Sequence, residues 1–172
     1  MCEMNAFEQP CGVPIIPFGS KPAYDAKPSD DQDIIDEALY MYRANIMFKN
    51  FKILGPADKL IVYLTCFIQK CLQDISKKPD KETASKVVGE LVSQSVPTSA
   101  DPEFFMRKLG LLTKSKNNTE EEKFRKYLAS LKAECATRLL NVLFNPQTGA
   151  LDAKHWIALG KKPFLGQKFS GI

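Results

Sequence analysis

The segment "PADKLIVYLTCFIQKCLQDISKKP" (residues 56–79) decides the fold of this chain. A helix that is apolar nearly all round is either buried in a large core or spans a membrane. Thr65, Gln69 and Lys70 interrupt the apolar run, which falls short of the roughly 20 residues needed to cross a bilayer. The sequence therefore predicts a central helix over about 57–78 that other helices enclose. Its apolar side chains are Leu60, Ile61, Val62, Tyr63, Leu64, Cys66, Phe67, Ile68, Cys71, Leu72 and Ile75.

Segments on both sides of this helix have helical periodicity and few alternate with the period of a strand. The pattern predicts helices from Ile34 to about Ile46, over 81–94, after Asp101, over 119–144, and after Asp152. The fold class is therefore all-α, with about five to six helices in one domain. At 172 residues, a single domain is also what the length favours.

Polar residues at the expected helix ends predict how these helices are capped. Ser29 with Gln32, and Thr119 with Glu122, have the spacing of capping boxes at the starts of the first and the longest helix. Gly110 is placed to end the short helix after Asp101 in a left-handed conformation.

Both ends of the chain have an irregular, apolar composition. Residues 1–28 contain five of the eleven prolines, which predicts an extended arm followed by a helical domain over 29–172. The apolar stretch "VPIIPFG" (13–19) within this arm has to dock, either on its own domain or on a partner. The end "GKKPFLGQKFSGI" (160–172) is an irregular tail that also has to dock on its own domain or on a partner.

The charge and the cysteine content argue against several classes of protein. The net charge of +4 is mildly basic and below what a dedicated nucleic-acid module has. Five irregularly spaced cysteines do not form a disulfide framework, which indicates reduced thiols in a reducing compartment. No charged region followed by an apolar region opens the chain, so we expect no secretory signal.

The sequence offers little material for a catalytic, cofactor or metal site. His155 is the only histidine, and one histidine with irregular cysteines supports neither a triad nor a metal cluster. Paired carboxylates lie near expected helix starts, where the helix dipole explains them better than a glycosidase-like pair does. No phosphate loop is present. We therefore expect no catalytic residues, no cofactor and no metal.

The stretch "DIIDEALYMYRANIMFKNF" (33–51) combines aromatic and basic residues. This combination raises an alternative, a nucleic-acid-binding helical domain that uses its basic, aromatic segments. Aromatic residues at helical spacing are more often core residues, and no nucleic-acid-binding fingerprint is present. The alternative remains the second interpretation of the sequence.

The same stretch resembles a signature of the actin-related protein 2/3 complex subunit 3 family. In that family an acidic "D-I-x-D-E-A" start leads into "Y-x-x-A-N-x-x-F-K-N-[YF]". The segments "ADKLIVYLTCFIQKCL" (57–72), "RKYLASLKAECATRLLNVLFNPQTG" (125–149) and "KHWIALGKKPF" (154–164) are also similar to it. The resemblance spans about residues 13 to 170 and is loose over 80–118.

The resemblance implies an all-helical fold with one enclosed helix and no catalytic activity. It implies a subunit of a seven-subunit cytoplasmic assembly of the actin cytoskeleton that nucleates branched actin filaments. The chain would pack beside actin-related protein 3, and the actin-related subunits would bind the ATP. Other subunits of the complex are thus the expected partners, with filament actin as a further one, and neither nucleic acid nor membrane insertion is expected.

Two sets of residues are the candidates for the partner interface. In the tail, apolar side chains are the expected anchors and lysines the polar rim. Basic residues at the end of the first helix form the second set, which would face an actin-related subunit or filament actin, whose surfaces are acidic. The candidates are Phe164, Leu165 and Phe169 with Lys161, Lys162 and Lys168 in the tail, and Arg43, Lys49 and Lys52 in the second set.

Overall fold

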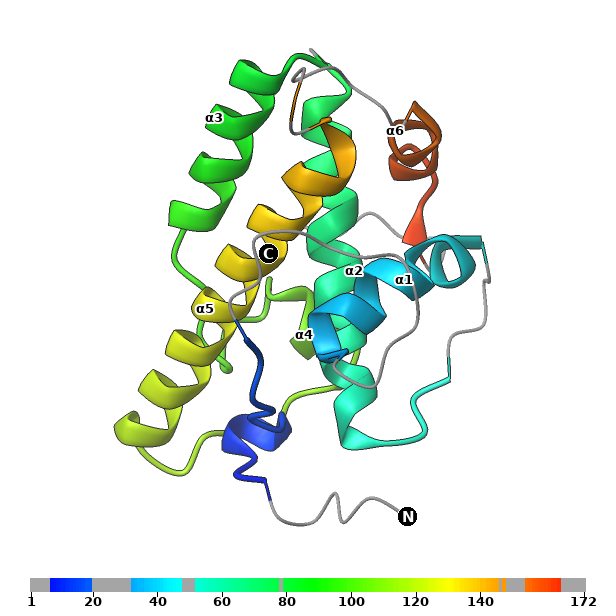
Figure 1. The fold of residues 1–172 in the computed structure, drawn as a ribbon. Helices are drawn as coiled ribbons and strands as arrows, with labels where there is room; N and C mark the ends of the chain where they lie inside the picture. The colour runs from blue at the N-terminus through cyan, green and yellow to red at the C-terminus, as the bar shows by residue number, and fades with distance from the viewer. Residues whose placement is uncertain are drawn as a thin grey trace.

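A computed structural model describes residues 7–19, 32–47, 52–77, 79–145, 147 and 154–164, and these ranges form six α-helices and one short 3-10 turn. The helical fold expected from the sequence is confirmed (Figure 1). In chain order the elements are η2 (Pro10–Gly12), α1 (Ile34–Met47), α2 (Pro56–Ile75), α3 (Lys81–Ser93), α4 (Phe105–Lys108), α5 (Asn118–Leu143) and α6 (Lys154–Gly160).

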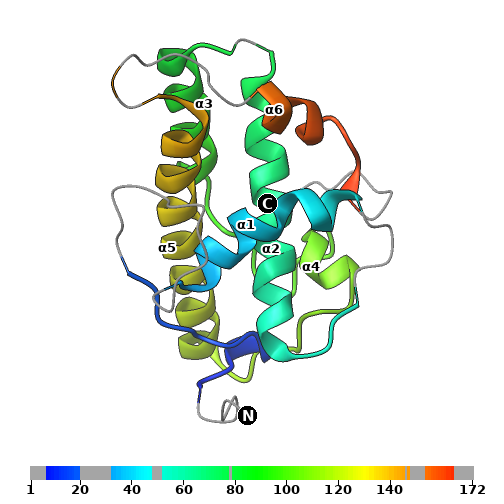
Figure 2. The ribbon, with the colours of Figure 1, turned by 45° about the vertical axis from the view of Figure 1, so that its right-hand side comes forward.

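Helix α2 is the enclosed helix that the sequence predicts. Every side chain from Leu60 to Gln69 is buried, and α1, α3, α5 and α6 all contact α2. Figures 1 and 2 show α3 and α5 on one side of α2, α6 on the other, and α1 lying across it. Within the described ranges, none of the helices combines the length and hydropathy required to cross a bilayer.

A fully buried arginine joins α5 to the beginning of α1. Arg138 donates to both carboxylate oxygens of Asp33 at 2.7 and 2.9 Å, and to Asp36 at 2.8 Å. It also donates to Glu134 on its own helix at 2.9 Å and to the carbonyl oxygen of Gly19 in the arm at 2.6 Å. Burial opposes the charge of Arg138, but its carboxylate partners outweigh this and raise its pKa. The guanidinium therefore stays charged inside the protein.

The start of α1 is capped by the same carboxylate that Arg138 binds. Asp33 accepts the backbone N–H groups of Ile35 and Asp36, each at 3.1 Å. The Asp36 carboxylate in turn accepts the N–H of Asp33 at 3.3 Å. The capping pair is thus Asp33 with Asp36, and the proposed Ser29 partner lies outside the described residues.

The N-cap of helix α5 lies two residues before the position that we expected to cap it. The side-chain oxygen of Asn117 accepts the N–H of Glu120 at 2.9 Å, whereas Thr119 lies inside the helix and is exposed. The predicted capping box of Thr119 with Glu122 is therefore wrong. Asparagine is also a strong N-cap residue, and Asn117 stands where the helix starts. Gly110, with a φ of +70°, ends the short helix as predicted, and Asp152 lies outside the described residues.

The described part of the arm docks on its own domain. Cys11 and Val13 are buried, and the N–H of Cys11 donates to the Glu120 carboxylate at 3.0 Å. The Tyr127 hydroxyl accepts the N–H of Ile16 at 3.1 Å and donates to its carbonyl at 2.8 Å. Residues 8–18 thus belong to the same folded unit as α5, and the proposed boundary at residue 28 lies outside the described residues.

Helix α6 approaches α2 closely at a glycine. A Cβ built on Gly160 would lie 2.5 Å from the Cβ of Leu72 and 3.3 Å from its carbonyl carbon. Gln69 of α2 also donates from its side-chain amide to the carbonyl of Lys162, just after α6. The backbone of α6 can lie this close only because Gly160 has no side chain.

We predict that Gly160→Ala destabilises the protein, by about 1–3 kcal/mol, because the added methyl group overpacks the contact between α6 and α2. The matched control is Gly89→Ala in α3, where a Cβ meets nothing within 4 Å and where alanine favours the helix by up to about 1 kcal/mol. Urea denaturation followed by circular dichroism measures both. A Gly160→Ala protein as stable as Gly89→Ala would contradict the close contact.

We also predict that Arg138→Met lowers the free energy of unfolding by about 3–5 kcal/mol at pH 7, because it removes the buried positive charge that binds Asp33, Asp36 and Glu134. Burial raises the pKa of Asp33, but the hydrogen bonds from Arg138 and the Asp36 N–H outweigh this and hold it below its ordinary value. The Asp33 carboxylate therefore contributes to the free energy of unfolding above about pH 3.9. This contribution is lost as the pH falls through the lower pKa that Asp33 has in the folded state.

The measurement is urea denaturation of both proteins between pH 7 and pH 2.5. The difference in unfolding free energy between wild type and Arg138→Met should shrink as the pH falls below about 4, because the carboxylates of the unfolded chain take up protons there while Asp33 in the folded protein is still ionised. Lys126→Met removes a charge from the exposed face of the same helix and serves as the control with little effect at either pH. A difference that is constant with pH would contradict the role of the ion pairs.

Candidate functional site

Five of the nine candidate interface residues lie in the described part of the chain. Four of them are exposed, and one, Phe164, is fully buried. The exposed four are Arg43 on α1, Lys52 before α2, and Lys161 and Lys162 directly after α6. The remaining candidates, Lys49, Leu165, Lys168 and Phe169, lie outside the described residues.

Phe164 does not form part of an exposed surface. Its side chain has no exposed area and belongs to the main core of the domain. The tail segment therefore docks on its own domain at this residue, and we remove Phe164 from the candidate interface. An aromatic side chain in an irregular tail gives no sign in the sequence of whether it packs inward or on a partner.

The fold brings the two candidate sets together at one place. Arg43 of α1 and Lys162 after α6 line the same hollow, of about 310 Å³, together with His155, Ala158 and Leu159 of α6. The sequence separates Arg43 and Lys162 by more than a hundred positions, and only the packing of α1 and α6 on α2 makes them neighbours. Lys52 is exposed on the loop before α2 and does not line this hollow.

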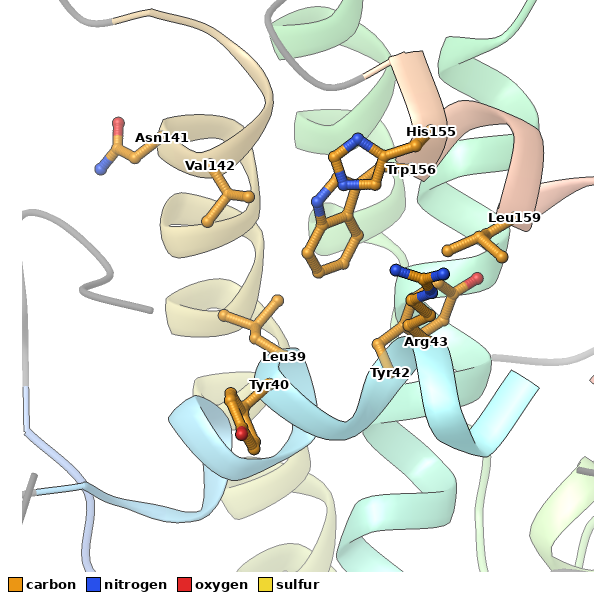
Figure 3. A pocket seen from close by; sticks show the side chains of 9 residues that line it. All are labelled: Leu39, Tyr40, Tyr42, Arg43, Asn141, Val142, His155, Trp156 and Leu159. Carbon is orange, nitrogen blue, oxygen red and sulfur yellow. The ribbon is translucent and has the colours of Figure 1, made fainter. Parts of the chain in front are cut away.

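A larger groove of about 470 Å³ adjoins this hollow and runs between α1, α5 and α6 (Figure 3). Trp156 of α6 reaches into it and stacks on Tyr42 of α1, with ring centroids 5.5 Å apart and ring planes 7° from parallel. Arg43 and His155 lie on the groove's α1 and α6 sides. The nine lining residues are Leu39, Tyr40, Tyr42, Arg43, Asn141, Val142, His155, Trp156 and Leu159.

A third hollow, of about 590 Å³, continues along the outer face of α1 past Arg43. Its apolar side chains are well exposed: Tyr40 by 51%, Met41 by 38% and Met47 by 54%. The sulfur of Met47 lies 3.1 Å from the Lys162 ammonium, which links this face to the end of α6. We call the residues lining the three hollows the α1–α6 surface.

Sequence reasoning missed the exposed apolar part of this surface. Tyr40, Ala44 and Met47 follow helical spacing and form a second stripe on α1, opposite the stripe of core residues. A helix with apolar residues on two faces needs cover on both, and this is the signal that could have found them. His155, the only histidine of the chain, is exposed at the edge of the groove.

The chemistry of the surface suits contact rather than catalysis. Among the described residues, no group of histidine, cysteine and acidic side chains could hold a metal ion. The four cysteines in these ranges are buried, free thiols. Burial raises the pKa of Cys135 to about 12 and raises that of Cys66 and Cys71 as well, so these thiols are neutral and unreactive.

We predict that Trp156→Ala destabilises the protein by about 1–3 kcal/mol, because Trp156 is half-buried and stacks on Tyr42. Trp156→Phe keeps an aromatic ring there and should recover most of the loss. Urea denaturation followed by circular dichroism is the measurement, since Trp156 is the only tryptophan and both changes remove its fluorescence. Equal stability of the two variants would show that the stack contributes little.

The comparisons with known proteins all point to the same family. The family model described as P21-Arc, the ARP2/3 complex ARPC3 (21 kDa) subunit, matches residues 2–169. Actin-related protein 2/3 complex subunit 3 of Arabidopsis thaliana is 32% identical over 157 residues, covering 90% of this chain and 88% of the relative. The protein of the same name from Dictyostelium discoideum is 31% identical over 170 residues, covering 96% and 94%.

A third relative, from Caenorhabditis elegans and named as a probable actin-related protein 2/3 complex subunit 3, is 31% identical over 147 residues, covering 85% of this chain and 79% of the relative. The family model and the relatives thus cover nearly the whole chain, including all six helices. The resemblance seen in the sequence is confirmed: the chain belongs to the ARPC3 family of ARP2/3 complex subunits, which are structural subunits and not enzymes.

Proposed function

We propose that this chain packs against actin-related protein 3 in the ARP2/3 complex and supports the nucleation of branched actin filaments. In this role it is a non-catalytic subunit of the cytoplasmic actin cytoskeleton. The α1–α6 surface is the contact that we assign to the partner. Family membership supports the assembly, and the geometry of this surface supports its place on the chain.

One observation carries the assignment of the surface. Exposed apolar side chains occur there together with basic side chains that have no acidic partner in the described part of the chain, around Tyr40, Arg43 and Met47 on α1. Contiguous exposed apolar area on a soluble domain marks an interaction site. A core of aromatic, methionine and arginine side chains with a lysine rim has the composition of a protein–protein interface.

A nucleic-acid interface fits the same residues less well. The aromatic rings of α1 divide between the core, as with Tyr42, and one exposed position, Tyr40. No row of exposed aromatic rings for base stacking results within the described ranges. We therefore favour a protein partner.

The test uses the complex reconstituted with and without this chain. We expect crosslinks from Lys161 and Lys162 to carboxylates of actin-related protein 3, detected by mass spectrometry. We also expect fewer branches per length of filament, counted by fluorescence microscopy, when the chain is left out. Crosslinks exclusively to other subunits would contradict the packing, and an unchanged branch density would contradict the role in nucleation.

Truncating the tail is a poorer test of the same idea. A chain ending at Lys162 lacks Phe164, which is fully buried in the core. Removal of a buried phenylalanine costs about 3–5 kcal/mol, so such a chain would lose stability whether or not the tail contacts a partner. Substitutions of exposed residues separate folding from assembly.

A further inference from the structure

We propose that the α1–α6 surface receives a segment of a neighbouring subunit in which a large apolar side chain is flanked by carboxylates. The apolar side chain enters the groove between α1, α5 and α6, and the carboxylates bind Arg43 and Lys162. The identity of the neighbouring subunit rests on the proposed function, but the chemistry of the segment follows from the surface itself.

The groove has the size and lining for an apolar group. Its volume of about 470 Å³ lies in the range of pockets that bury a ligand. Leu39, Val142, Trp156 and Leu159 supply aliphatic and aromatic walls from three helices (Figure 3). The stack of Trp156 on Tyr42 fixes the position of the indole before any partner binds, which reduces the entropy lost on binding.

The charges around the groove are all of one sign. Arg43 lines all three hollows of the surface, and Lys162 joins it at the smallest. None of the described residues that line these hollows is acidic. Glu37 is the exposed acid of α1, and six positions before Arg43 place it about 120° away around the helix. The surface therefore presents uncompensated positive charge beside an apolar groove.

The basic side chains of this surface also differ from five lysines on other faces of the molecule. Several lysines on other faces bind an acid of this chain: Lys70, Lys77, Lys86, Lys108 and Lys123. Within the described ranges, Arg43 has no acidic partner, and Lys162 contacts the sulfur of Met47. Cations left unpaired next to exposed apolar side chains are complementary to a partner that brings its own carboxylates.

Arginine at the centre of the surface favours a carboxylate with defined geometry. The planar guanidinium can donate two parallel hydrogen bonds to one carboxylate, which an ammonium group cannot do. Tyr40, Ala44 and Leu159 line the hollows next to Arg43 and would exclude water from such a pair once the groove is filled. Exclusion of water strengthens the interaction between the charges.

The first experiment replaces the charges in the reconstituted complex. Arg43→Glu combined with Lys162→Glu should increase the rate at which this chain dissociates from the immobilised complex by on the order of tenfold or more. Both side chains are exposed, so the fold is expected to be unchanged. Lys126→Glu, an exposed reversal on the outer face of α5, is the matched control and should change the rate less than about twofold. Equal rates for the two variants would overturn the proposal.

The second experiment identifies the occupant directly. A benzophenone amino acid replaces Ala158, which is exposed and lines the smallest hollow, and in a control replaces Ala129 on the exposed face of α5. Irradiation of the assembled complex and mass spectrometry should find, from position 158, a peptide of another subunit with a large apolar residue within about three positions of Asp or Glu.

The outcomes separate this proposal from the proposed function. Crosslinking from position 158 to a peptide without acidic residues, to a second copy of this chain, or to nothing in an intact complex would overturn the proposal. In each of these cases, lysine crosslinks to actin-related protein 3 and the loss of branches without the chain would leave the proposed function standing. An acidic, apolar peptide from a different subunit would support the chemistry of the surface while contradicting the packing against actin-related protein 3.

Discussion

The buried guanidinium of Arg138 is the interaction on which the arrangement of the helices depends. A buried charge is tolerated only when its hydrogen bonds are satisfied, and Arg138 satisfies its own with Asp33 and Asp36 of α1, Glu134 of α5 and the carbonyl of Gly19. These partners come from three separate parts of the chain. Only one relative placement of α1, α5 and the arm brings them all within hydrogen-bonding distance, so the ion pairs select that placement in a way that apolar packing alone would not.

The candidate surface follows from this placement together with one close helix contact. Arg138 holds the beginning of α1, and the core stripe of α1 packs on α2, so the opposite stripe with Tyr40 and Met47 faces outward. At the other end of the surface, the absence of a side chain at Gly160 lets α6 lie against Leu72 of α2. These two constraints put α6 beside α1 (Figure 2), and the groove lies between the two helices. The groove is thus built by residues that do not line it.

The buried polar groups of α5 show why local sequence patterns succeed for helices and fail for their contacts. Lys132 and Arg138 lie on the inner face of α5 and are fully buried. Lys132 donates to the carbonyls of Leu91 and Gln94 at the end of α3, where a positive charge is favourable. A charged residue within a helix is usually read as solvent-facing, and nothing in the sequence near Lys132 or Arg138 indicates otherwise. Apart from Glu134, their partners lie tens of residues away, outside the reach of any local rule.

The sequence by itself determined that the chain is helical and that α2 is enclosed, because hydrophobic periodicity and composition are local properties. The resemblance of its motifs to those of a known family indicated the family. It also marked Arg43 and Lys162 as separate candidates for a partner contact. Only the tertiary structure decided that these two residues share one surface, that Phe164 is core, and that Asp33 both caps α1 and binds Arg138. The physical reason is that burial and proximity depend on how distant segments pack, and a single buried charge or a single missing Cβ can fix that packing without leaving a periodic pattern.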